Sequence, residues 1–236
     1  MIQHLKIYTS TLRYWIVAAM LTATIALSAQ THYIPHVWVG AHGGMTLSEI
    51  AFSPSVRKTF NEGFTGGVSF RFAEERHVGL LAELNIVQRG WKENFEEDDF
   101  EYNRQLTYVS LPIMTHIFFG SRVVKFFVNL GPEVCYMIGE RINSNFDYKN
   151  PNSVPGFPTH NRSTEQMGME IKNRFDYGIS GGLGAEFVIK KRHSIYVEGR
   201  YYFGLGNIYS ASKKDTFSAS RHSSIMVTLG YHLRIK

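Results

Sequence analysis

The segment Ile195–Leu205 reads IYVEGRYYFGL. Apolar and aromatic side chains, with one glycine among them, occupy its odd-numbered positions, whereas both of its charges, Glu198 and Arg200, occupy even-numbered positions. This period of two predicts a β-strand with one apolar and one polar face. The segment also has about the 9–11 residues that a tilted membrane-spanning strand needs, whereas strands of globular proteins usually stop after about 5–6 residues.

Similar alternation recurs along the chain and predicts eight long strands in all. The other seven are His36–Thr46, Phe64–Phe72, Val78–Arg89, Thr107–Phe119, Phe126–Ile138, Phe175–Ile189 and Ser224–Arg234. One face of these strands is free of Asp, Glu, Lys and Arg. The opposite face carries the charged residues Arg71, Glu83, Arg89, Glu133, Asp176, Glu186, Glu198 and Arg200. Because a lipid-facing Arg or Lys costs about 2–4 kcal/mol at the bilayer midplane, this segregation is typical of a membrane barrel.

The connections between the strands alternate in length. Those at 73–77, 120–125 and 190–194 are short, whereas those at 47–63, 90–106, 139–174 and 206–223 are long. Short periplasmic turns and long outer loops are the outer-membrane pattern, and an even strand number returns the C-terminus to the side of the N-terminus. The predicted fold class is therefore all-β, an eight-stranded antiparallel up-and-down transmembrane β-barrel.

A soluble lipocalin-like barrel has the same period with its apolar face turned inward. Two features favour the membrane orientation. Glycines share the charged face, where they leave room in a narrow lumen; they are Gly131, Gly178, Gly182, Gly184 and Gly204. Aromatic residues gather near strand ends, as in the interfacial girdles of membrane barrels; they are Phe118, Phe119, Phe126, Phe175, Tyr177, Phe203 and Tyr231. The connection 139–174 is rich in Asn, Pro and Gly, and we expect it to be the least ordered part.

The N-terminus predicts export. Lys6 and Arg13 precede the apolar run Trp15–Leu27, which ends at Ser28-Ala29. A basic region, a short apolar run and small residues describe a secretory signal peptide, and the run is shorter than the roughly 20 residues of a membrane-spanning helix. We therefore expect a signal peptide at 1–29, an outer membrane β-barrel at 30–236, and localisation in the cell outer membrane.

Composition excludes several classes of function. The net charge of +5 is small and scattered, so nucleic acid is not an expected partner. Cys135 is the single cysteine, so one chain cannot form a disulfide or a cysteine metal site. No histidine has the HExxH spacing, and we expect no metal and no cofactor. The acidic stretch Glu93–Glu101 matches no calcium-loop template; it predicts a solvated outer loop.

The charged residues of the inward face are the candidate site. An eight-stranded lumen is only wide enough for its own side chains, so these five acids and three arginines should pair as a salt-bridged polar plug. A proton or cation path is the alternative, and a porin is not expected. A catalytic set at the outer rim is a further alternative, because Ser220, His222 and Asp215 all fall in or near one outer connection.

Four groups of residues carry a family resemblance. They are Tyr108–Ile113, Val128–Pro132, Phe175–Gly178 with Gly181–Gly184, and Glu198–Tyr202 with Gly204-Leu205. In order and spacing they resemble the PorT-like outer-membrane β-barrel family of the Bacteroidetes, over most of residues 35–234. The resemblance implies an OmpA-like eight-stranded barrel and no shared activity, although one branch of the family supports type IX secretion. The terminal Leu233-Arg234-Ile235-Lys236 departs from the pattern, because it lacks a final aromatic residue.

We therefore expect a non-enzymatic outer-membrane barrel that serves as a membrane anchor, as a loop-display protein or as a PorT-like secretion accessory. Its expected partners are outer-membrane lipids and lipopolysaccharide, together with secretion-system or surface proteins. The alternative is a barrel enzyme, modifying lipid A or phospholipid or cleaving peptides, with an active site at the rim. A soluble ligand carrier is the third hypothesis, and the orientation of the two faces distinguishes it.

Overall fold

The computed structural model of the chain describes residues 35–73, 77–95, 99–158, 163–211 and 215–236. The predicted signal peptide at 1–29 lies outside these ranges, as do Glu96, Glu97, Asp98 and His160. None of the helices in the described ranges has the length and apolar character of a bilayer-spanning helix.

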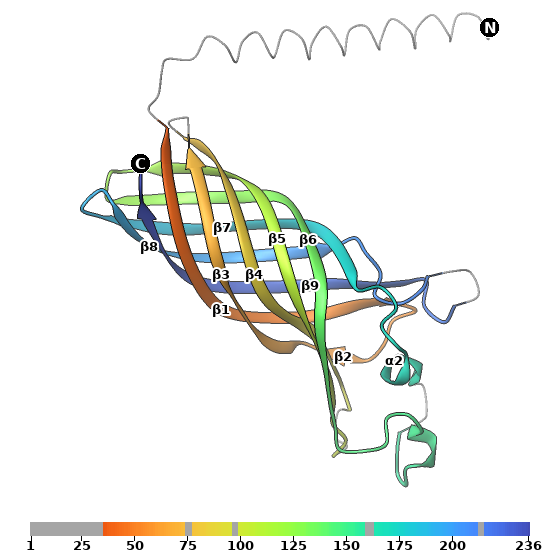
Figure 1. The fold of residues 1–236 in the computed structure, drawn as a ribbon. Helices are drawn as coiled ribbons and strands as arrows, with labels where there is room; N and C mark the ends of the chain where they lie inside the picture. Colours follow the sequence, from red (N-terminus) through yellow and green to blue (C-terminus); the bar gives the residue numbers. More distant parts are fainter. Residues whose placement is uncertain (1–34, 74–76, 96–98, 159–162, 212–214) are drawn as a thin grey trace, which may run out of the picture. The chain divides into compact units, whose positions relative to one another are not determined.

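Eight long antiparallel strands in the described part of the chain form a closed ring (Figure 1). They are β1 (His36–Ser53), β3 (Asn61–Ala73), β4 (Val78–Glu93), β5 (Tyr102–Gly120), β6 (Val124–Ser144), β7 (Phe175–Ile189), β8 (His193–Gly204) and β9 (Ala219–Arg234). Each pairs with the next long strand, and β9 pairs with β1 to close the ring. The two-residue β2 (Lys58–Thr59) pairs with the end of β4. The predicted eight-stranded up-and-down barrel is confirmed.

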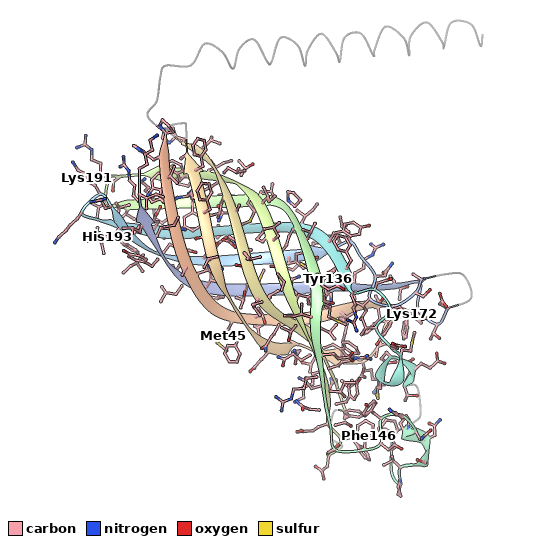
Figure 2. The ribbon with its side chains drawn as sticks, in the orientation of Figure 1. Met45, Tyr136, Phe146, Lys172, Lys191 and His193 are labelled. Carbon is pink, nitrogen blue, oxygen red and sulfur yellow. The ribbon has the colours of Figure 1, made fainter. Side chains whose placement is uncertain are left out.

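The two faces of the strands are oriented as in a membrane barrel. Leu130, Leu183 and Leu229 on the outer face are 58%, 69% and 63% exposed, whereas Glu83 and Glu198 on the inner face are 2% and 1% exposed. Met45 and Tyr136, which are labelled in Figure 2, are also exposed on the outer face. A soluble carrier would have the opposite arrangement, with aliphatic side chains lining an interior cavity and carboxylates in water.

Several strands extend beyond their predicted ends on the side of the long connections. β5 begins at Tyr102 instead of Thr107, β6 ends at Ser144 instead of Ile138, and Tyr102 pairs with Ser144. The outward positions of these extensions are polar, for example Asn103 and Gln105. The alternation of apolar and polar residues therefore ends at the outer edge of the apolar belt. The hydrogen-bonded strands continue beyond this edge, on the side of the long connections.

The short-turn end of the barrel also holds the start of β1 and the end of β9. The backbone N–H of Val37 donates to the carbonyl of Lys236 at 3.0 Å. In an outer-membrane barrel this end faces the periplasm. The β7–β8 turn at this end contains Lys190 and Lys191, with φ of 51° and 63°.

The connection 145–174 contains two short helical elements where the structure describes it. They are a 3-10 turn (Pro151–Ser153) and the short helix α2 (Glu165–Gly168). Gln166 and Met167 of α2 are completely buried. Isolated apolar residues among the polar ones, such as Phe157 and Ile171, anchor the connection to the rest of the molecule.

Candidate functional site

The centre of the lumen contains an ion pair that spans the barrel. Arg200 of β8 donates through both of its Nη atoms to the carboxylate of Glu83 of β4, at 2.6 and 2.9 Å. Three long strands separate β4 from β8 in either direction around the ring, so this bidentate pair lies along a diameter. Arg200 Nη2 also lies 2.9 Å from Glu198, and Asn85 donates to Glu83 at 3.0 Å. Every charge of this group has lost its water and is compensated by direct hydrogen bonds.

A second pair spans the lumen nearer the periplasmic end. Arg71 of β3 donates to both carboxylate oxygens of Glu186 of β7, at 3.0 and 2.8 Å. The hydroxyl of Ser194 donates to Glu186 at 2.5 Å. The ring of His116 lies 3.4 Å from Arg71 Nη1 and is held on its other side by Asn129 at 2.7 Å.

A third pair lies nearer the outer end. Arg89 donates to Glu133 at 2.6 Å, and its guanidinium lies 3.7 Å from the centre of the Tyr202 ring. Seven of the eight candidate residues thus meet in three ion-paired groups. The eighth, Asp176, instead accepts hydrogen bonds from Tyr202 Oη and from the backbone N–H of Tyr177, both at 2.9 Å.

Histidines complete the polar interior. His42 on β1 points inward, and its Nε2 lies 3.9 Å from Glu83. His116 and His232 are also buried, and His232 lies 3.0 Å from Ser69 Oγ. Strand alternation alone could have identified these two, because they occupy even-numbered positions on strands whose odd-numbered residues face outward.

An aromatic cluster closes the periplasmic end of the lumen. Trp38, Phe118, Phe127 and Tyr196 pack together with Ala73. The guanidinium of Arg71 lies 4.4 Å from the Trp38 ring, so the cluster joins the ion-paired layer directly. Phe118 was expected in an interfacial girdle, but it is only 8% exposed and faces inward. Neighbouring residues of a strand point to opposite faces, and here Phe119 takes the outward position.

A larger cluster, which we call the cap, covers the outer end. It is built from the extended strand ends and from the connections that follow β1, β4, β6 and β8. Phe52 is its centre and lies 5.5 Å from Trp91, 6.2 Å from Tyr209 and 5.1 Å from Phe217, measured between ring centroids. The cluster also includes Val56, Phe95, Tyr102, Leu106, Phe157, Met167, Ile171 and Ile208. The lumen is therefore covered by packed side chains at both ends.

Arg104 of β5 holds the loop of the cap by hydrogen bonds. It donates to Glu140 at 2.6 Å, to the carbonyls of Gln166 and Met169 at 3.3 and 2.6 Å, and to Tyr209 Oη at 3.1 Å. Tyr209 Oη donates in turn to the Gln166 carbonyl at 2.7 Å. Burial raises the pKa of Tyr209 well above its usual value, so the phenol remains a donor at neutral pH.

The acidic stretch 93–101 begins inside the cap, which corrects part of the expectation of a solvated loop. Glu93 is only 2% exposed and accepts hydrogen bonds from Trp91 Nε1 at 3.2 Å and Gln166 Nε2 at 3.0 Å. The signal that could have shown this is Trp91, which needs a partner for its N–H when buried. In the part of the chain that the structure describes, no group of three or more His, Cys, Asp or Glu residues is arranged to hold a metal ion.

Ser220 and His222 of the rim set are not arranged as a nucleophile and its base. Ser220 and His222 lie within β9, not in a loop, and both are 1% exposed. His222 Nε2 lies 2.9 Å from Tyr108 Oη, and Ser220 Oγ accepts a hydrogen bond from the backbone N–H of Tyr209 at 3.0 Å. The sequence predicts that this strand begins at Ser224, but β9 begins at Ala219. The predicted start was wrong because polar residues occupy both faces of the strand at this end.

Comparison with known proteins gives one family. The protein-family model described as "Outer membrane protein beta-barrel domain" matches residues 28–210 of this chain. No curated protein sequence matches the chain. Among solved structures, OprG from Pseudomonas aeruginosa is 10% identical with a TM-score of 0.51, over 86% of this chain and 98% of that chain. This likeness supports the fold.

Two other solved structures are similar at a lower TM-score. Neisserial surface protein A is 13% identical with a TM-score of 0.44, over 84% of this chain and 96% of that chain. Outer membrane protein W from E. coli is 15% identical with a TM-score of 0.43, over 85% and 99% of the two chains.

Proposed function

The chain belongs to the outer membrane protein β-barrel domain family, and from this premise we propose that it is a sealed, non-enzymatic barrel that anchors a folded cap outside the cell. The family indicates the outer membrane as its location. The observation that carries the proposal is the cap itself. Its aromatic core, centred on Phe52, lies beyond the apolar belt, where an anchor alone would need only short loops.

The lumen supports an anchoring role and argues against transport. Successive layers, from the Trp38 cluster through the Arg71, Arg200 and Arg89 ion pairs to the cap, fill it from end to end. A hydrated ion would have to break buried, bidentate hydrogen bonds in order to pass, and opening such a pair leaves an uncompensated charge.

The cap supports a display role because it has a packed core. The carbonyls of Gln166, Met167 and Met169 are held by Arg104, Tyr102 and Tyr209, which fixes the loop around α2 on the extended strands. A surface held in this way loses less conformational entropy on binding than a flexible loop does. Secretion-system or surface proteins and lipopolysaccharide are the partners we propose, and the PorT-like motifs favour a secretion accessory.

The surroundings of Ser220 and His222 weigh against the enzyme alternative. Nucleophilic catalysis needs a hydroxyl within hydrogen-bond reach of a base, and a path for the substrate. Here His222, the only candidate base of the pair, is buried against Tyr108, and Ser220 Oγ accepts a hydrogen bond from the backbone N–H of Tyr209.

A cap deletion tests the proposed function. In cells that carry only the variant, residues 146–173 are replaced by a short Gly-Ser linker, and heat-modifiable gel migration verifies that the barrel is intact. We expect secretion into the medium or cross-linking to surface partners to be lost. Phe217→Ala, which unpacks the cap without removing loop residues, should reduce the same readouts. Unchanged secretion and cross-linking in both variants would contradict display by the cap.

A further inference from the structure

The periplasmic end of the barrel carries a group of basic residues. They lie in the β5–β6 turn, in the β7–β8 turn and after the end of β9. We call this group the basic arc, and it consists of the exposed residues Arg122, Lys190, Lys191, Arg192 and Lys236. Lys125 and Arg234 lie at the same end but point inward: Lys125 Nζ is 4.9 Å from the centre of the Phe118 ring, and Arg234 Nη2 is 2.6 Å from His36 Nδ1. The described segments 119–125, 188–194 and 233–236 contain no Asp or Glu side chain. The sequence between β3 and β4 includes Glu74, Glu75 and Arg76, which lie outside the described residues.

Backbone hydrogen bonds place the three parts of the arc side by side. The N–H of Val188 donates to the carbonyl of Val123 at 2.7 Å, which joins the β7–β8 hairpin to the β5–β6 turn. The N–H of Arg234 donates to the carbonyl of Arg192 at 2.7 Å, which joins the same hairpin to the end of β9. The backbone segments that carry the arc are therefore adjacent at this end of the barrel.

The β7–β8 turn has lysines where the backbone favours other residues. Lys190 and Lys191 are exposed, and both have a positive φ, a conformation that suits Asn-Gly in tight hairpin turns. Side chains with a Cβ are strained in this region, and such strain persists where the side chain serves a purpose. Figure 2 shows Lys191 and His193 at the end of the barrel opposite the outer loop residue Phe146.

The residues next to the arc identify its partner. Outward apolar side chains lie immediately on the membrane side of it. Phe119 pairs with Phe126, and their exposed rings are 6.1 Å apart. Phe187 and Ile195 are also paired and exposed. Aromatic and aliphatic residues bordered by Lys and Arg mark the level where acyl chains meet lipid headgroups.

We propose that the basic arc binds the phosphate headgroups of anionic phospholipids in the periplasmic leaflet of the outer membrane. A soluble acidic protein is a poorer fit. The exposed apolar residues next to the arc lie in the lipid, where a soluble protein cannot contact them, whereas the acyl chains of a phospholipid bound at the arc can. The inference depends on the orientation of the barrel and is independent of what the cap binds.

Lipid selectivity of the folded barrel tests this proposal. The protein is reconstituted in phosphatidylcholine bilayers, and spin-labelled phosphatidylglycerol and phosphatidylcholine compete for the protein surface at low and high salt. We expect a several-fold preference for phosphatidylglycerol that weakens as salt rises. The variant Lys190→Asn/Lys191→Gly removes two charges and suits the turn, so it should fold with unchanged or higher stability while its lipid preference falls toward one.

A matched variant removes the same charge from the other end. Lys149→Asn/Lys172→Asn takes two exposed lysines from the outer loops, and it should keep the full preference for phosphatidylglycerol. Equal association of both lipids with the wild type would overturn the proposal. A preference that survives Lys190→Asn/Lys191→Gly would do the same. If the wild type lacks lipid preference yet binds soluble polyglutamate through this turn, the partner is an acidic protein and the lipid proposal fails.

Discussion

Arg200 and Glu83 lie on strands at opposite ends of a barrel diameter, yet their side chains meet with N–O distances of 2.6 and 2.9 Å. This ion pair, which we call the central brace, therefore links opposite sides of the barrel through the lumen, in addition to the hydrogen bonds between neighbouring strands. Arg71 and Glu186 form a second brace nearer the periplasm, with the same separation around the ring. These contacts explain why long polar side chains occupy the inside of an eight-stranded barrel that has no room for a channel.

Removing one partner of the central brace should destabilise the barrel strongly. Arg200→Met leaves Glu83 and Glu198 buried and uncompensated, and the expected loss is about 3–5 kcal/mol of unfolding free energy. Urea unfolding in detergent, followed by heat-modifiable gel migration, measures it. The triple variant Glu83→Gln/Glu198→Gln/Arg200→Met removes all the charges and should recover much of the loss. Equal stability of the single variant and the wild type would contradict the brace.

The sealed lumen should show in conductance. Wild-type protein in planar lipid bilayers should give no steady channel current, with a porin in the same bilayers as the positive control. The cap-shortened variant should remain silent as well, because the Arg89, Arg200 and Arg71 layers and the Trp38 cluster still fill the lumen. Steady ohmic steps from the wild type would show that these layers are open to water and ions.

Phe217 should hold the cap closed against protease. Phe217→Ala removes a fully buried ring that packs on Phe52, a change that costs about 3–5 kcal/mol in a packed core. We expect faster cleavage of the outer loops by externally added protease while the barrel stays intact. Phe60→Ala is the matched control, because this ring is 50% exposed and its removal should leave the cleavage rate unchanged. Equal rates in all three proteins would contradict a packed cap.

Tyr209 should make the cap sensitive to alkaline pH. Because the folded-state pKa of Tyr209 is raised by burial, the protonated phenol stabilises the cap fully below the ordinary tyrosine pKa of about 10. This contribution is lost as pH rises through the folded-state pKa. Protease resistance of the cap should therefore fall above about pH 10 in the wild type. Tyr209→Phe should show a smaller fall, and identical pH profiles would remove Tyr209 as the cause.

The membrane-embedded part of this fold could be predicted from residue alternation. The strand Phe175–Ile189 was predicted with the bounds that the structure has, because apolar residues mark its outer face along its whole length. The charged inner face followed from the same pattern. Which arginine meets which carboxylate could not be predicted, because Arg200 and Glu83 are brought together by ring closure and not by sequence spacing.

The cap could not be predicted, for a different physical reason. Beyond the apolar belt both faces of a strand can be polar, so β5 and β6 lose their alternation while their backbones remain paired. The core residues of the cap come from separate elements, such as Trp91 from the end of β4 and Met167 from α2, and they carry no common period. Their burial results from tertiary packing, which also encloses Glu93.

If aliphatic side chains face lipid and the lumen excludes both lipid and water, nitroxide labels on the two faces should differ in accessibility. Labels are placed singly in a Cys135→Ala background at the outward Leu111 and Leu183 and at the inward Ser110 and Ser180. In reconstituted bilayers the outward labels should collide with oxygen and not with a water-soluble nickel complex, whereas the inward labels should be protected from both. Ready collision of the nickel complex with the inward labels would contradict the account.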